Sequence, residues 1–211
     1  MTIKFYDYAP APSPRKARMV LAEKDIPHEN IQVDMMKAEQ LSSEFRSINP
    51  NCTIPALVLE DGTALFDNLG IAAWAEEYKP DPSLVGQTPA EKGLVMSWVA
   101  KCDMHGGISF MEAYRNSHPK MAGRAIPGKE NYEQIPELAE RGFARLAVFL
   151  DDLNAHLEGR DWIALDQFSL ADIWAFSILG VTPWIKAAPG EQHPNILRWQ
   201  AAINERPSAK L

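Results

Sequence analysis

The chain has 211 residues, of which 46% are hydrophobic and 23% are charged, so it can bury a core and is neither disordered nor fibrous. Its formal net charge of −7 argues against nucleic acid or an anionic membrane as a partner, because both bind basic faces. We expect no membrane span and no secretion signal. The two cysteines lack metal-ligand spacing, so we expect a reduced, cytoplasmic protein without a metal.

The first part of the chain alternates strands with helices. We predict strands over 3–7 and 29–33, helices over 14–24, 40–48 and 69–78, and a hairpin around Asp61-Gly62. The order is βαβ, then a helix, then ββα. Parallel strands joined by a helix need a crossover, and the late hairpin adds an antiparallel edge. The first part is therefore predicted to be an α/β domain over residues 1–80.

A proline-rich stretch, residues 79–83, marks the change to a purely helical pattern. We expect a linker over 81–88 and an all-helical domain over 89–211. The expected helices cover 89–117, 133–157, 170 to about 187, and 194–205, with a loop over 118–131 and irregular structure over 162–168. The third helix is apolar throughout, which is typical of the buried centre of a bundle. Ser169 and Asp172 form a capping box at its start.

The segment over 49–68 carries most of the functional information. Pro55 lies in a turn before a short apolar strand, where a cis peptide bond costs little, and Ile54 can present its backbone to an extended peptide. Asp67 and Asn68 open a helix whose first N–H groups suit a carboxylate. The pattern indicates a site for a small anionic peptide. A hairpin followed by an ordinary helix cap is the structural alternative.

Ser13 precedes or begins the first helix, so its hydroxyl either caps that helix or donates to a ligand thiolate. Tyr6 and Tyr8, at the end of the first strand, either pack on the sheet or offer a phenol to the same thiolate. His105 and Tyr114 lie on the first long helix and are either packing or ligand-facing residues. Cys52 has no basic neighbour in sequence and is interpreted as inert.

A series of motifs follows in order along the chain: Asn49-Pro50, Ile54-Pro55, the Glu60-Asp61-Gly62 hairpin, Asp67-Asn68, the proline linker and Ser169-Leu170-Ala171-Asp172-Ile173. With these motifs in this order, the chain resembles the cytosolic glutathione transferases over nearly its whole length. The resemblance implies a thioredoxin-like domain, an all-helical domain, glutathione as cosubstrate and a homodimer that serves detoxification. It also implies that Thr53, Ile54, the cis-proline Pro55, Asp67 and Asn68 bind glutathione.

The thiol-activating residue departs from the serine and cysteine classes of that family. Their activating position is Ala11 here, and the run 9–13 looks most like Nu-class and Ure2p-like transferases, which carry Thr and Asn where this chain has Ala11 and Ser13. Ser13 is therefore the expected catalytic residue. A small hydrophobic electrophile is expected near Tyr8, His105 and Tyr114.

The predicted reaction is attack of the glutathione thiolate on that electrophile, with glutathione-dependent disulfide reduction as a further activity. Two alternatives stay open at this point. One is a non-catalytic binding or scaffold protein with the transferase fold. The other is a glutathione-dependent isomerase, dehalogenase or ether-cleaving enzyme.

Overall fold

The computed structural model describes residues 2–211, which divide into two compact units. The first runs to Pro82 and includes residues 127–130 and Leu211, and the second comprises residues 83–126 and 131–210. The predicted class, a mixed α/β part followed by an all-helical part, is confirmed. Among the described residues, no helix is both long and apolar enough to cross a membrane.

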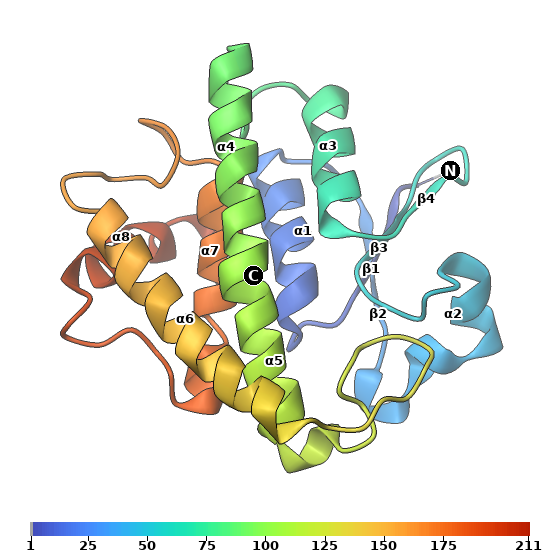
Figure 1. Ribbon diagram of the computed structural model, residues 1–211. Helices are drawn as coiled ribbons and strands as arrows, with labels where there is room; N and C mark the ends of the chain where they lie inside the picture. The colour runs from blue at the N-terminus through green and yellow to red at the C-terminus, as the bar shows by residue number, and fades with distance from the viewer. Residues whose placement is uncertain (1) are drawn as a thin grey trace. The chain divides into compact units, whose positions relative to one another are not determined.

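The first unit is built on a four-stranded sheet in the order β2-β1-β3-β4 (Figure 1). Its strands are β1 (Lys4–Asp7), β2 (Glu29–Gln32), β3 (Ala56–Val58) and β4 (Ala64–Leu65). Its helices are α1 (Pro12–Glu23), α2 (Ser43–Ile48) and α3 (Asn68–Tyr78), with the 3₁₀ turns η1 (Met35–Lys37) and η2 (Glu39–Leu41). β1 pairs parallel with β2, and β3 pairs antiparallel with β4, as the sequence predicts. The antiparallel pairing of β1 with β3 joins the two halves of the sheet.

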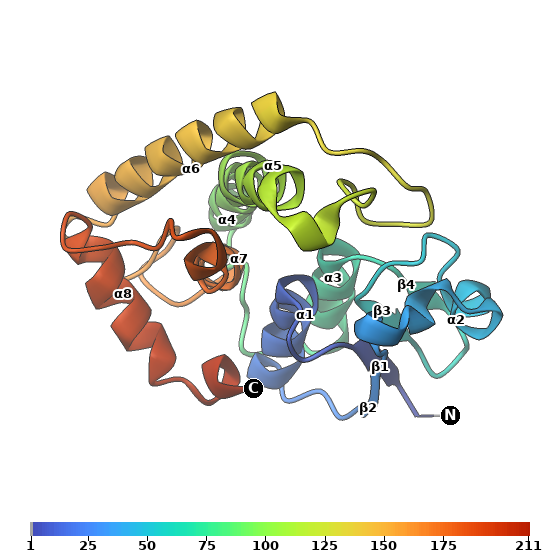
Figure 2. The ribbon, with the colours of Figure 1, turned by 90° about the horizontal axis from the view of Figure 1, so that it is seen from below.

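Helices cover both faces of this sheet, and successive side chains of β1 point to opposite faces. Phe5 is fully buried on one face, and on the other the ring of Tyr6 meets that of Phe45 from α2 edge to face, with centroids 5.9 Å apart. α1 and α3 pack side by side (Figure 2). This packing brings the first turns of α1 and α3 together, which is the arrangement the site needs.

Two buried ion pairs hold the first unit together. Arg18 of α1 binds both oxygens of Asp7 at 2.9 Å. The fully buried Lys24 ammonium lies 2.7 Å from Glu76 and donates to the carbonyl oxygens of Lys79 and Pro80 at 3.0 and 3.3 Å. All three N–H bonds of Lys24 thus have an acceptor, which fastens the end of α3 to α1.

The second unit is helical throughout. Its elements are α4 (Pro89–Lys101), the π-helical segment η3 (Cys102–Gly107), α5 (Ile108–Ser117), η4 (Pro119–Met121), α6 (Pro136–His156), α7 (Leu170–Leu179), η5 (Thr182–Ile185), α8 (Pro194–Asn204) and η6 (Pro207–Lys210). Every residue of α7 is buried, as the apolar pattern predicts. Figure 2 shows α7 between α4 and α8 within this unit. The predicted capping box is present: the backbone N–H of Ser169 donates to Asp172 at 3.0 Å.

The close contacts of η3 and α5 with α6 depend on glycine. A Cβ on Gly142 would lie 2.5 Å from the backbone nitrogen of Ala113, and one on Gly106 would lie 2.8 Å from the ring of Phe149. Real Cβ atoms do not approach so closely, so both positions require glycine for the helices to pack at this separation. The crossing fixes α5, which carries the aromatic residues described below.

Several predicted helix limits are wrong, for identifiable reasons. The helix predicted over 89–117 is interrupted by η3, where two consecutive glycines weaken the regular ladder. The helix predicted to reach about 187 ends at Leu179, because Gly180 and Pro183 follow. The helix predicted from 133 begins at Pro136, a residue suited to a first turn. The one predicted over 40–48 is a 3₁₀ turn followed by α2.

Candidate functional site

Ser13 lies in the first turn of α1 and is exposed. It is not the N-cap: that position is Ala11, which makes no side-chain cap, so the reading of Ser13 as a capping serine is wrong. Its oxygen instead accepts a hydrogen bond from Nδ2 of Asn68 at 3.2 Å. A serine that is not occupied with its own helix end keeps its hydroxyl available to a ligand.

The first turn of α1 has an unusual set of backbone donors. A helix leaves its first few N–H groups without intrahelical partners. Here Pro12 and Pro14 have no N–H, and the N–H of Ala11 donates to the carbonyl oxygen of Tyr8 at 2.8 Å. The N–H of Ser13 is the donor that remains at this turn. Backbone and hydroxyl hydrogens of one residue therefore carry the anion-binding capacity of this helix end.

Asn68 is the first residue of α3, and its side chain connects the two helices. Its Oδ1 accepts the backbone N–H of Ala17 at 3.1 Å, while its Nδ2 donates to Ser13. Asp67 precedes it as the N-cap of α3, with Oδ1 accepting the N–H of Gly70 at 2.8 Å. The other oxygen of Asp67 has no hydrogen-bond partner within residues 2–211. An exposed carboxylate with a free oxygen suits a ligand ammonium group.

The Ile54–Pro55 peptide bond is cis, as predicted. β3 pairs with β1 only from Ala56 onward, so the N–H and C=O of Ile54 take no part in the ladder. Thr53 is held from behind, because Nδ2 of the buried Asn49 donates to its carbonyl oxygen at 2.7 Å and to its hydroxyl at 3.2 Å. The loop is thereby fixed with the Ile54 backbone polar groups outside the sheet.

Tyr6 and Tyr8 both pack against an apolar cluster formed by Val33, Phe45 and Ile54. Burial, with a smaller contribution from nearby Glu29 and Glu44, raises the pKa of the Tyr6 phenol. Tyr6 therefore stays a neutral phenol at physiological pH. A neutral phenol keeps its hydrogen to donate, and Tyr8 presents apolar surface in the same unit.

Sequence reasoning missed Gln40 in η2. Its side chain is buried, and its Oε1 has no hydrogen-bond partner in the part of the chain that the structure describes. A buried carbonyl oxygen without a donor is rare in folded proteins and therefore marks an unusual position next to α2. In sequence, a glutamine at the start of a helical pattern looks like a surface residue, so only its burial identifies it.

In the second unit, Tyr114 belongs to a cluster of aromatic rings on α5 and η5. Its ring stacks on Phe110 at 5.6 Å, contacts His118 at 5.1 Å and lies 5.6 Å from the half-exposed Trp184. His105 is exposed on η3, and none of these ring contacts involves it. Trp184 was missed because it falls where the sequence predicted a continuing helix. The cluster offers flat apolar surface to an aromatic ligand.

Comparison with known proteins agrees with this geometry. Residues 11–78 match the family model for the glutathione S-transferase N-terminal domain, and residues 112–207 match that for its C-terminal domain. Glutathione S-transferase F10 of Arabidopsis thaliana is 32% identical over 96% of this chain and 93% of its own length. The disulfide-bond oxidoreductase YfcG of Escherichia coli is 28% identical over 95% of this chain and 90% of its own.

Among solved structures, a glutathione S-transferase from Methylobacillus flagellatus with glutathione bound superposes with a TM-score of 0.82. It is 26% identical over 99% of this chain and 98% of its own. Family models match both parts of the chain, and relatives align along nearly its whole length. The chain therefore belongs to the glutathione S-transferase family.

Proposed function

We propose that this protein binds glutathione on its first unit, holds the cysteinyl sulfur as a thiolate at Ser13, and transfers it to a small hydrophobic electrophile. The observation that carries the proposal is the first turn of α1. Ser13 is exposed there, its N–H is the remaining backbone donor, and its oxygen is already hydrogen-bonded by Asn68. An anion held at one point, such as a sulfur, matches this arrangement.

The rest of the first unit supplies a place for each part of the tripeptide. The backbone of Ile54, next to the cis-proline Pro55 and fixed through Thr53, pairs with the cysteinyl residue as an added strand would. The free oxygen of Asp67 binds the γ-glutamyl ammonium, and the first N–H groups of α3, at Asn68, bind the γ-glutamyl carboxylate.

For the electrophile, we propose the aromatic cluster of the second unit. Tyr114 and Trp184 present ring surface on one unit, and a flat aromatic substrate gains by offset or edge contacts with such rings. His105 is an exposed polar residue on η3 of the same unit. An activated aryl halide is the electrophile of choice for an assay.

Disulfide reduction is the further activity we propose, in line with the relationship to an oxidoreductase. The bound thiolate attacks a small disulfide, forming a mixed disulfide of glutathione and expelling one substrate thiolate. A second glutathione then attacks this mixed disulfide, which releases the other substrate thiol and oxidised glutathione. Cys52 and Cys102 are buried and form no disulfide within residues 2–211, so neither sulfur is accessible to act as a relay. Two cysteines outside any disulfide also fit a reducing compartment such as the cytoplasm.

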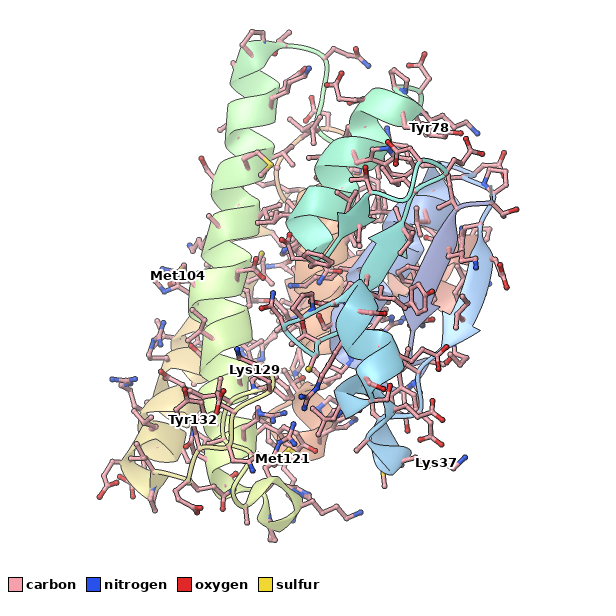
Figure 3. All side chains as sticks on the ribbon, turned by 90° about the vertical axis from the view of Figure 1, so that its right-hand side faces the viewer. Lys37, Tyr78, Met104, Met121, Lys129 and Tyr132 are labelled. Atoms are coloured by element: carbon pink, nitrogen blue, oxygen red, sulfur yellow. The ribbon has the colours of Figure 1, made fainter. Side chains whose placement is uncertain are left out.

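We propose a homodimer as the assembled form. Large apolar side chains are exposed along one helical run: Leu94 and Met96 of α4, Met104 of η3 and Ile108 of α5 are each at least 41% exposed. Figure 3 shows Met104 projecting from this run. Large apolar side chains exposed along one run of helix are available for a protein–protein contact. Light scattering at micromolar concentration should give twice the 23.6 kDa chain mass, and a single-chain mass would refute the dimer.

One experiment separates this function from a scaffold with the same fold. The protein should be retained on immobilised glutathione and eluted by free glutathione. It should also conjugate glutathione to an activated aryl halide above the uncatalysed rate. Retention without either conjugation or disulfide reduction would leave a glutathione-binding module. Failure of retention would refute the proposed site itself.

A further inference from the structure

The side-chain amide of Asn68 is held in one orientation by two different groups of α1. Its Oδ1 accepts the N–H of Ala17 at 3.1 Å, and its Nδ2 donates to Oγ of Ser13 at 3.2 Å. If the amide were turned over, its NH₂ group would face the N–H of Ala17, donor against donor. The backbone of α1 therefore decides which end of Asn68 meets Ser13.

This orientation determines what the serine hydroxyl can do. A hydroxyl has one hydrogen and two acceptor sites. Asn68 occupies an acceptor site, so the single hydrogen of Ser13 is left to donate elsewhere. Asn68 is also the one side chain that hydrogen-bonds Ser13 within residues 2–211, and Ser13 is exposed. The hydrogen is therefore available to a ligand atom lying on the solvent side of the turn.

We propose that Asn68 is a positioning residue for the reaction, which orients the hydroxyl of Ser13 so that its hydrogen points at the glutathione sulfur. This inference rests on the proposed function and assigns Asn68 a role beyond contact with the γ-glutamyl group. Asn68 touches no reacting atom in this role. It acts through Ser13, and donation into the serine oxygen makes the hydroxyl a better donor in turn.

The test compares Asn68→Ala and Asn68→Asp with the parent protein by two readouts. The first is the pKa of the bound glutathione thiol, from thiolate absorbance against pH, and the second is the Kd for glutathione from calorimetry. In Asn68→Ala the hydroxyl loses its fixed orientation, and the thiolate fraction at neutral pH should fall about two- to tenfold. Glu77→Ala, at an exposed position on the same helix, is the matched control and should change neither readout.

Asn68→Asp keeps the shape and the acceptor for Ala17 but reverses the contact with Ser13. The carboxylate accepts the serine hydrogen and takes it from the sulfur, so the thiolate fraction should fall further than in Asn68→Ala. The negative charge introduced by Asn68→Asp also acts on the sulfur directly. Both Asn68 substitutions are therefore measured again in a protein that also carries Ser13→Ala. In that background Asn68→Ala should leave the thiol pKa unchanged, since the group through which Asn68 acts is gone.

The possible outcomes distinguish a failure of the role proposed for Asn68 from a failure of the role proposed for Ser13. If Ser13→Ala raises the thiol pKa while Asn68→Ala alters only the Kd, Asn68 is a γ-glutamyl contact and the inference is overturned. Additive shifts in the double variant would overturn it as well, because the two residues would then act independently. If Ser13→Ala itself leaves the thiol pKa unchanged, the proposed role of Ser13 is what fails.

Discussion

Ser13→Ala tests the proposed chemistry most directly, and its size can be worked out from the site. A free thiol has a pKa near about 8.5, and each unit of depression corresponds to about 1.4 kcal/mol of preference for the thiolate. A hydrogen bond to a charged acceptor contributes about 1.5–3 kcal/mol, and a helix N-terminus about 0.3–1 kcal/mol. The hydroxyl therefore accounts for roughly one to two units, and the helix end for less.

The substitution removes the hydroxyl and leaves the backbone N–H of residue 13 in place. The pKa of the bound thiol should rise by about one to two units, and conjugation near neutral pH should fall roughly ten- to a hundredfold. Because the thiolate is the reactive form, activity should recover as pH rises through the new pKa. Ser13→Thr keeps a hydroxyl and should retain most of the activity.

The assay is a pH–rate profile for an activated aryl halide at saturating glutathione, with thiolate absorbance as the independent measurement. A parallel loss of rate at all pH values, with an unchanged thiol pKa, would contradict the reasoning. In that case the N–H of residue 13 holds the sulfur, or a phenol from Tyr6 or Tyr8 does.

Three other predictions concern parts of the molecule away from Ser13. Lys24→Met removes the buried ammonium that pairs with the carboxylate of Glu76. The free energy of unfolding, measured with denaturant, should fall by about 3–5 kcal/mol. A fall of less than about 1 kcal/mol would mean that water replaces the ammonium. Trp184→Ala should raise KM for an aryl electrophile and leave KM for glutathione and for an aliphatic electrophile unchanged, whereas an equal rise for both electrophiles would exclude stacking. Replacing both Cys52 and Cys102 by Ala should preserve conjugation and disulfide reduction, because neither buried sulfur takes part in the proposed reactions. Loss of reduction alone in the Cys52 variant, with the circular dichroism spectrum intact, would make Cys52 a redox participant.

The sequence predicted the sheet because its signals are local. The alternation at 3–7, the Asp61-Gly62 turn and Pro55 each act over a few residues, and they predict a parallel βαβ pair and an antiparallel hairpin. The order of the strands in the sheet was not predicted. The buried α7 was equally readable, because its apolar residues leave no polar face.

What the sequence could not predict depends on contacts between distant residues. Ser13 and Asn68 are 55 positions apart, and nothing in either neighbourhood indicates that an amide from one helix reaches a hydroxyl on another. The π-helical segment was missed because a single wider turn, with one extra residue, hardly changes the hydrophobic pattern by which a helix is predicted. The Gly106-Gly107 pair was the available signal. Trp184 required knowing that the helix before it stops at Leu179.

The prolines on either side of Ser13 have a consequence for which anions this protein accepts. Helix ends that bind phosphate do so by surrounding several oxygens with several N–H groups. Here two of those groups are missing because Pro12 and Pro14 cannot supply them, and a third is satisfied within the chain. An oxyanion with its charge spread over three or four atoms finds too few donors, whereas a thiolate needs only one point of contact. On the proposed function, selectivity for sulfur at this turn would follow from the backbone hydrogens that Pro12 and Pro14 lack.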